Sequence, residues 1–132
     1  MLYLPDTNLF SAYFQRRDER LLRRVAASMH EMRLSSLVLA ELEYGATKSG
    51  LARHRSRIEE LVATLAVEPF LRGDSASYGR LRAHLATRGE IIGAVDLLIA
   101  SQALRLGATV VTHNTREFSR VPGLKFEDWQ SP

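Results

Sequence analysis

The residues from Ala108 to Thr112 constrain the fold more strongly than any other segment of this sequence. They form a continuous run, Ala-Thr-Val-Val-Thr, that is rich in β-branched side chains and has no alternation of apolar and polar residues. Such a run is typical of a central strand in a parallel sheet, because helices cover both faces of that strand. An apolar helix from Gly93 to Leu106, ended by Gly107, directly precedes it. This succession predicts a fold in which helices alternate with parallel strands.

The same alternation recurs along the rest of the chain. Leu2 to Leu4 predicts a buried strand that stops at Asp6, Met32 to Leu34 predicts a second strand, and Leu124 to Phe126 predicts a short edge strand. Helical spacing and capping signals predict further helices. These helices span residues 7–14, 18–29, 35–49, 51–66 and 74–88. We expect one domain over residues 1–132, built as an α/β sandwich around a mostly parallel sheet.

The composition is that of an ordinary globular protein. Of the 132 residues, 45% are hydrophobic and 25% are charged, and there is no cysteine. The lack of cysteine excludes a disulfide framework and a thiolate metal site. No apolar run approaches the ~20 residues that cross a bilayer, and the N-terminus lacks the basic region of a signal peptide. We therefore expect a cytoplasmic protein that does not contact a membrane.

The charge balance favours a polyanionic partner. The net charge is +3, and among the 18 basic residues only Lys48 and Lys125 are lysines. Arginine presents a rigid donor fork that suits phosphate, so the basic surface is compatible with nucleic acid. The alternative is that these arginines form solvated helix faces, partly paired with neighbouring acids. Charge alone does not separate the two interpretations.

Several polar residues lie where a parallel sheet binds ligands. Ligands of such sheets bind outside the carboxyl ends of the strands, and Asp6 and Asn114 follow the first strand and the Thr109–Thr112 strand, respectively. Glu41 and Asp96 lie in apolar helical segments, the latter in the first turn of the most apolar helix. No lysine or arginine lies in those segments, although an unpaired buried carboxylate costs several kcal/mol to desolvate.

Each of these residues also has a purely structural explanation. Asp6 can cap a helix, Glu41 can face solvent, Asp96 can interact favourably with a helix N-terminus, and Asn114 is a typical loop residue. A shared divalent cation explains them jointly, because Mg²⁺ prefers hard oxygen ligands. Bound Mg²⁺ activates water and stabilises charge on a phosphodiester. The spacing leaves open whether one ion or two are bound.

Other catalytic machinery is absent from the sequence. It contains no glycine-rich phosphate loop and no Gly-x-Ser-x-Gly motif. None of its histidines is paired at zinc-ligand spacing; they are His30, His54, His84 and His113. We expect the first three to be surface residues. His113, which adjoins the candidate site, has either a structural role or a contact with substrate.

Four segments together resemble the PIN-domain family, and specifically its VapC-like toxins. They are Leu4 to Asn8, Ser35 to Gly45, Asp96 to Ala100 and Val111 to Trp129. Any one of them is a weak signal, since Asp-Thr-Asn alone is common. All four occur in the family's order and span almost the whole chain, which makes the resemblance specific.

The resemblance implies a PIN-like three-layer α/β sandwich with helices on both faces of the sheet. It implies an endoribonuclease that cuts structured RNA such as tRNA, in which Asp6, Glu41 and Asp96 bind Mg²⁺, with Mn²⁺ as a substitute. It also implies a homodimer and a cognate VapB-like antitoxin, through which operator DNA is contacted.

Two positions depart from the family pattern. Many members have an acid where this chain has Asn114 and an aliphatic residue where it has Pro5. Asparagine can still hydrogen-bond a metal-bound water, and Glu117 is close enough in sequence to supply the fourth ligand, so both alternatives stay open. The proline is tolerated at a strand end or edge.

Asn114 keeps a second hypothesis open, in which a PIN-like module binds RNA or a partner without cutting. A third reading, a phospho-acceptor or phosphatase domain, is disfavoured. It requires a second acid close to Asp6 and a lysine after the Thr109–Thr112 strand, where the chain has Asn8 and His113.

Overall fold

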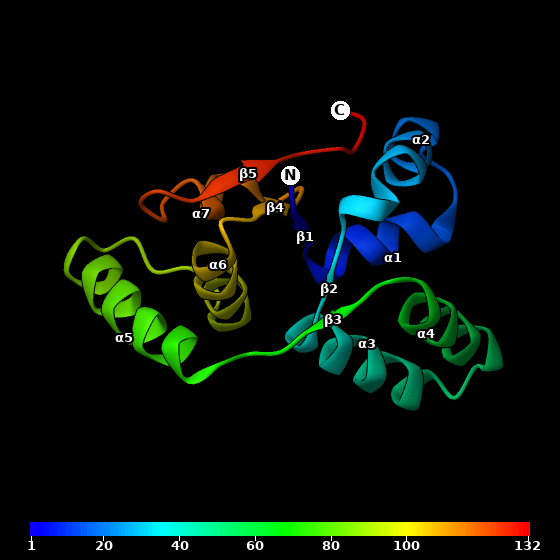
Figure 1. Ribbon diagram of the computed structural model, residues 1–132, viewed down its shortest axis with the longest axis horizontal. Helices are drawn as coiled ribbons and strands as arrows, with labels where there is room; N and C mark the ends of the chain where they lie inside the picture. The colour runs from blue at the N-terminus through cyan, green and yellow to red at the C-terminus, as the bar shows by residue number, and fades with distance from the viewer.

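The structure, a computed structural model, describes residues 1 to 132. Strands and helices alternate along the chain (Figure 1). In chain order they are β1 (Tyr3–Pro5), α1 (Thr7–Gln15), α2 (Glu19–Ser28), the 3₁₀ turn η1 (Met29–Glu31), β2 (Leu34–Ser35), α3 (Ser36–Ser49), α4 (Ala52–Thr64), β3 (Val67–Glu68), α5 (Arg72–Thr87), α6 (Ala94–Leu106), β4 (Thr109–Val111), α7 (Thr115–Phe118) and β5 (Lys125–Glu127). None of the helices combines the length and apolar character that crossing a bilayer requires.

Every strand pairing in the sheet is parallel. β4 lies between β1 and β5, and β2 pairs with β3. A bridge between Tyr3 and Met32, together with a 3.0 Å hydrogen bond from Arg33 N to Tyr3 O, joins the two groups. The strand order is therefore β3-β2-β1-β4-β5. The central position expected for the β-branched run and the edge position expected for the last strand are both confirmed.

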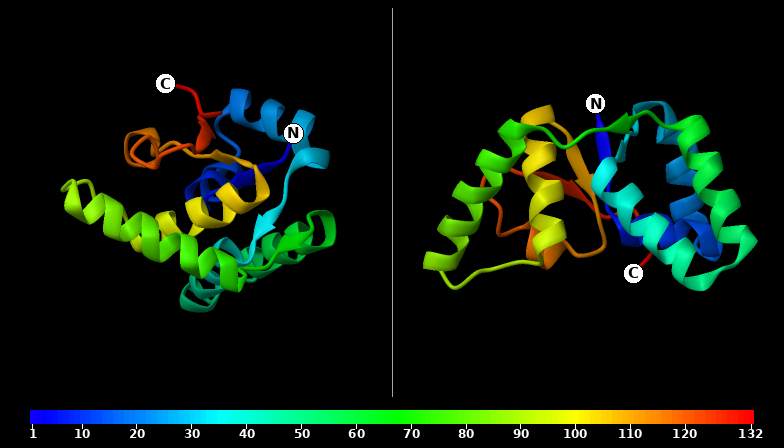
Figure 2. Two further views of the ribbon diagram at one scale, coloured as in Figure 1. Left: turned by 60° about the vertical axis from the view of Figure 1, so that its left-hand side comes forward. Right: turned by 90° about the horizontal axis from the view of Figure 1, so that it is seen from below.

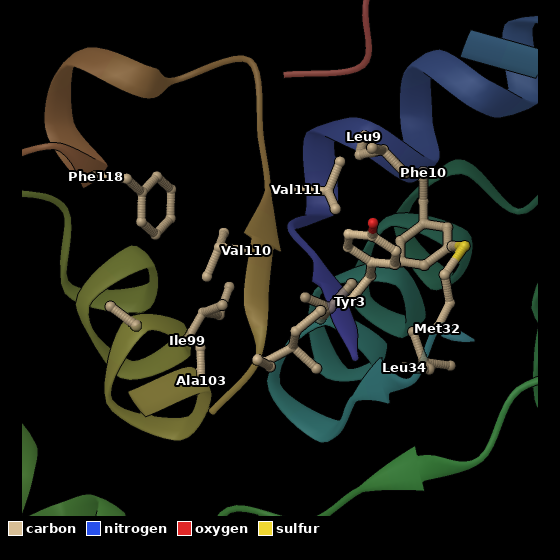
Figure 3. Close-up of a cluster of buried hydrophobic side chains, with 14 of the residues drawn as sticks. Tyr3, Leu9, Phe10, Met32, Leu34, Ile99, Ala103, Val110, Val111 and Phe118 are labelled. Atoms are coloured by element: carbon tan, nitrogen blue, oxygen red, sulfur yellow. The ribbon is translucent and has the colours of Figure 1, made fainter. Parts of the chain in front are cut away.

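Helices cover both faces of the sheet. Figures 1 and 2 show α5 and α6 on one side of the strands and α1 to α4 on the other. Side chains of β4 alternate between these layers: Val110 points toward Ile99 of α6, and Val111 points toward Leu9 and Phe10 of α1 (Figure 3). All five side chains are buried, and burying each contributes about 1.5–3 kcal/mol. The three-layer sandwich follows from this alternation.

The shortest elements differ from the sequence-based expectation. β2 covers Leu34–Ser35 rather than residues 32–34, and Met32 contributes only the single bridge to Tyr3. Three elements were not predicted, the 3₁₀ turn η1, the two-residue strand β3 and the four-residue helix α7. Elements this short carry no periodic pattern of their own. Neighbouring strands and packing decide their conformation instead.

Pro5 ends β1 without the loss of a sheet hydrogen bond. Asp6 N donates to Val111 O at 3.0 Å, which continues the pairing with β4 by one residue. Successive backbone groups of a strand point to opposite sides, so the nitrogen of Pro5 lies on the side away from β4. No pairing with β2 continues on that side beyond Tyr3. The missing N–H is therefore not required.

A buried hydrogen-bond network ties α6 to the start of α3. Gln102 is fully buried; its Oε1 accepts from Ser35 Oγ at 2.6 Å, and its Nε2 donates to Glu68 O at 2.9 Å. Ser35 Oγ also accepts from Leu37 N at 3.2 Å, which caps α3. One amide thus connects α6, β3 and the helix that carries Glu41.

We expect Gln102→Ala to lower the free energy of unfolding by about 2 kcal/mol, because it leaves buried polar partners unsatisfied. Chemical denaturation measures this change. Gln15→Ala is the matched control, since Gln15 is exposed and makes no side-chain hydrogen bond; it should change stability by less than about 0.5 kcal/mol. Equal stability of the two variants would contradict the structural role of Gln102.

Candidate active site

Asp6 is held rigidly at the carboxyl end of β1. Its side chain is 3% exposed; Oδ1 accepts from Leu9 N at 2.9 Å, and Oδ2 accepts from the hydroxyl of Thr112 at 2.6 Å. It therefore caps α1 as well as occupying the predicted site position. Burial raises the pKa of Asp6 above its ordinary value, and the charges of Glu41 and Asp128 raise it further; the hydrogen bonds from Thr112 and Leu9 oppose the rise.

Asp96 lies in the first turn of α6 and is half-buried. Burial, and then the negative charge of Asp6, raise the pKa of Asp96 to about 6. The charges of Glu117 and Glu41 add to this rise, and a hydrogen bond from Asn114 opposes it. These four groups act on one carboxyl group, so the structure brings together acids that are widely separated in sequence.

Glu41 joins this group from α3. Its carboxylate Oε1 accepts a hydrogen bond from the hydroxyl of Thr7, the residue that follows Asp6. Glu41 is an exposed residue, which agrees with the purely structural explanation that it faces solvent. Its charge nevertheless acts on Asp6 and Asp96, so it borders the site from the solvent side.

Asn114 and Glu117 lie next to each other beside Asp96. The side-chain amide of Asn114 donates to Asp96 Oδ2 at 3.3 Å and also to Glu117 Oε2. The backbone N of Asn114 donates to Thr112 Oγ1 at 2.9 Å. The two residues that the sequence left as alternatives are therefore neighbours, with the amide between two carboxylates.

Sequence reasoning missed three contributors to this site. Thr112 donates to Asp6, Thr7 donates to Glu41, and the charge of Asp128 acts on Asp6. Asp128 also contacts His113, with Oδ2 2.9 Å from the ring Nδ1. Two signals were available: Thr112 lies at a strand's carboxyl end, and all three residues lie in segments that resemble the PIN-domain family. The contacts themselves join distant segments and have no local signature.

The site carries negative charge without a basic partner. None of the ion pairs in the structure includes its four carboxylates. They belong to Asp6, Glu41, Asp96 and Glu117. By contrast, the fully buried Asp74 is neutralised by Arg105, whose Nε lies 2.7 Å from Asp74 Oδ1. The fold thus compensates a structural acid and leaves the acids at the sheet edge uncompensated.

The donor chemistry fits a divalent cation, although the side chains do not form a closed cage. No group of three or more His, Asp or Glu side chains is arranged to hold one ion jointly. Mg²⁺ keeps several of its waters and is commonly bound through one or two carboxylates plus substrate phosphates. Asp6 and Asp96, the two buried or half-buried acids, are the residues that fit direct coordination, and Glu41 and Glu117 fit contacts through water.

Comparison with known sequences points to one family. The PIN domain profile matches residues 3–124. The ribonuclease VapC2 of Rickettsia felis is 36% identical over 132 residues, which is 98% of each chain. The tRNA(fMet)-specific endonuclease VapC of Salmonella typhimurium is 35% identical over 128 residues, which cover 96% of this chain and 97% of that protein.

Solved structures show the same architecture. The crystal structure of VapBC2 from Rickettsia felis bound to a promoter DNA fragment has a chain that matches with a TM-score of 0.90 and 34% identity, covering 98% of this chain and all of that one. A chain of the DNA-bound VapBC from Salmonella typhimurium matches with a TM-score of 0.89 and 37% identity, covering 98% of this chain and 99% of that one.

The raised pKa of Asp96 predicts a pH-dependent effect on stability in metal-free protein. The folded carboxyl group titrates near pH 6 and the unfolded one near 3.8, so its stabilising effect is complete below pH 3.8 and is lost as the pH rises through about 6. In EDTA, the free energy of unfolding of Asp96→Asn should therefore exceed that of the parent protein by on the order of 1 kcal/mol at pH 7. At pH 4 the two proteins should differ little.

Urea denaturation at the two pH values measures this difference. Glu59→Gln, which removes an exposed carboxylate outside the site, is the control and should show no such pH dependence. The same stability offset for Asp96→Asn at both pH values would show that Asp96 has no raised pKa.

Proposed function

The chain belongs to the PIN-domain family, and we propose that it is a divalent-metal-dependent endoribonuclease of the VapC-like group. In this proposal Asp6 and Asp96 bind the ion directly, and Glu41 binds it through water. The observation that carries the proposal is a group of carboxylates at one edge of the sheet without a basic partner. Thr112 bonds both Asp6 and the backbone of Asn114, and the Asn114 amide bonds both Asp96 and Glu117. The names of the relatives support RNA as the substrate.

Mg²⁺ is the proposed ion, and Mn²⁺ can substitute for it, because the available donors are all oxygens. When bound, the ion supplies activation of water and compensation of the charge that develops on the phosphodiester. The protein's own contribution is to hold its carboxylates in place before substrate arrives. Hydrogen bonds from Leu9 N and Thr112 lock Asp6, and the first turn of α6 presents Asp96.

Two further residues position the acids rather than act on RNA. Thr7 orients Glu41 at the solvent side, and Asn114 holds Asp96 and Glu117 next to each other. In this arrangement Asn114 takes the place of the family's fourth acid, and Glu117 supplies the negative charge. A neutral amide among carboxylates reduces their mutual repulsion while the ion is absent.

The proposed substrate is structured RNA such as tRNA, and the proposed partner is a VapB-like antitoxin through which operator DNA is contacted. The tRNA(fMet)-specific names of relatives support the first, and the DNA-bound VapBC structures support the second. The homodimer and the cytoplasmic location expected from the sequence stay predictions.

The neutral Asn114 favours one alternative, a module that binds RNA or a protein partner without cleaving it. Incubation of the purified protein with bulk tRNA, in Mg²⁺ or in EDTA, separates the two functions. Fragments that appear only with Mg²⁺ support the enzyme. Retention of intact tRNA in both conditions would instead support the binding module.

We expect Asp6→Asn and Asp96→Asn each to reduce the rate of RNA cleavage by at least ~100-fold, because each removes a charge that holds the catalytic ion. Thermal unfolding should show that both variants stay folded. Glu59→Gln, which removes an exposed acid outside the site, should cleave at the parent rate. Full activity of either Asp variant would refute the assignment.

Thr112→Val tests the positioning of Asp6. The substitution keeps the side-chain shape at a buried site but removes the hydroxyl that donates to Asp6 Oδ2, and we expect the Kd for Mn²⁺ to rise about 10- to 100-fold. Calorimetric titration measures this affinity. Thr109→Val is the control, because Thr109 is a buried threonine in β4, three residues before Thr112, and its side chain makes no hydrogen bond. An unchanged Kd in Thr112→Val would contradict the positioning role.

A further inference from the structure

A pocket of about 550 Å³ lies beside the acids, between α1, α3 and α4. Thr7 and Glu41, which belong to the candidate site, form part of its wall. The pocket is therefore continuous with the acidic edge of the sheet. A chain-like substrate that crosses the acids on this side enters it directly.

The pocket wall carries guanidinium groups that the protein itself leaves free. Arg17, Arg53 and Arg57 line it. Arg57 is engaged, because it donates to Phe14 O at 3.2 Å and stacks 5.3 Å from the Phe14 ring. Arg17 and Arg53 are exposed and form none of the ion pairs or side-chain hydrogen bonds in the structure. Two free, always-charged donor forks at the pocket rim suit the phosphates of a polyanion.

The rest of the lining suits a nucleoside. Its apolar members come from three helices and are Phe14, Leu42, Ala46 and Ile58. Single-stranded RNA is bound by combining basic groups that follow the backbone with apolar or aromatic surfaces that receive the bases. Both kinds of surface are present in this one pocket.

A second pocket of similar volume lacks this combination of free arginines and apolar residues. It lies against α2 and the segment after β5, and three arginines line it together with Glu127 and Asp128. Arg24 there is bound to Glu127 at 3.2 Å and stacks on Trp129, and Arg20 donates to Gln130 O. Its arginines are largely committed within the protein, so the pocket beside Glu41 is the better phosphate site.

We propose that the pocket between α1, α3 and α4 binds a nucleotide of the RNA segment next to the cleaved bond, with Arg17 and Arg53 as its phosphate ligands. This inference rests on the proposed endoribonuclease function for the position of the bond. The binding itself needs no metal and no cleavage.

The test compares binding of labelled bulk tRNA in EDTA by the parent protein and by the double variant Arg17→Ala/Arg53→Ala. We expect the affinity of the double variant to fall roughly tenfold at low salt. The slope of log affinity against log[salt] should become shallower by about 1.4 to 1.8, the value for two lost phosphate contacts. Arg72→Ala is the control, because Arg72 is an exposed arginine at the start of α5, in the opposite helical layer. It should change the affinity by less than about threefold.

Cleavage of the same tRNA in Mg²⁺ separates this inference from the proposed function. A parent protein that binds tRNA without cutting it, together with a weakened double variant, would support the pocket and refute the nuclease. A parent protein that cuts, together with a double variant that binds like Arg72→Ala, would refute the pocket alone. Loss of antitoxin binding with unchanged tRNA binding would assign the pocket to the antitoxin and would also refute the inference.

Discussion

The arrangement at the sheet edge depends on the hydrogen bond between Thr112 and Asp6. It joins the residue after β1 to the residue after β4, and the same hydroxyl accepts from the backbone of Asn114. The parallel pairing of β1 with β4 brings the two strand ends into register. Through this contact the central pair of strands fixes the buried carboxylate, the cap of α1 and the start of the loop that carries Asn114.

The distribution of charge then separates the ion-paired buried acid from the acids of the candidate site. Asp74 is fully buried but ion-paired with Arg105, which is the usual condition for a stable buried charge. Asp6 and Asp96 are buried or half-buried without such a partner, and burial raises the pKa of both. Both acids lie at the same edge of the sheet, where a bound cation would compensate their charge. Free arginines lie beside that edge rather than within it.

The sequence predicted those parts of the site that depend on local structure. Asp6 and Asp96 were found because a strand end and a helix start are visible in a short window of sequence. The contact of Thr7 with Glu41 joins residues 34 positions apart, and that of Ser35 with Gln102 joins residues 67 apart. Neither has a local signature, and the two-residue strand β3 exists only because β2 lies beside it. Glu41 was a candidate because it lies in an apolar helical segment, and the resemblance to PIN-domain proteins added it to the acidic site.

Anomalous diffraction from crystals soaked in Mn²⁺ tests the central claim most directly, because it locates the ion without reference to activity. The account predicts an anomalous peak within coordination distance, about 2.0–2.4 Å, of carboxyl oxygens of Asp6 and Asp96. It also predicts that the peak disappears in crystals of Asp96→Asn. Saturating Mn²⁺ that binds elsewhere on the protein, and leaves these two carboxylates without an ion, would contradict it.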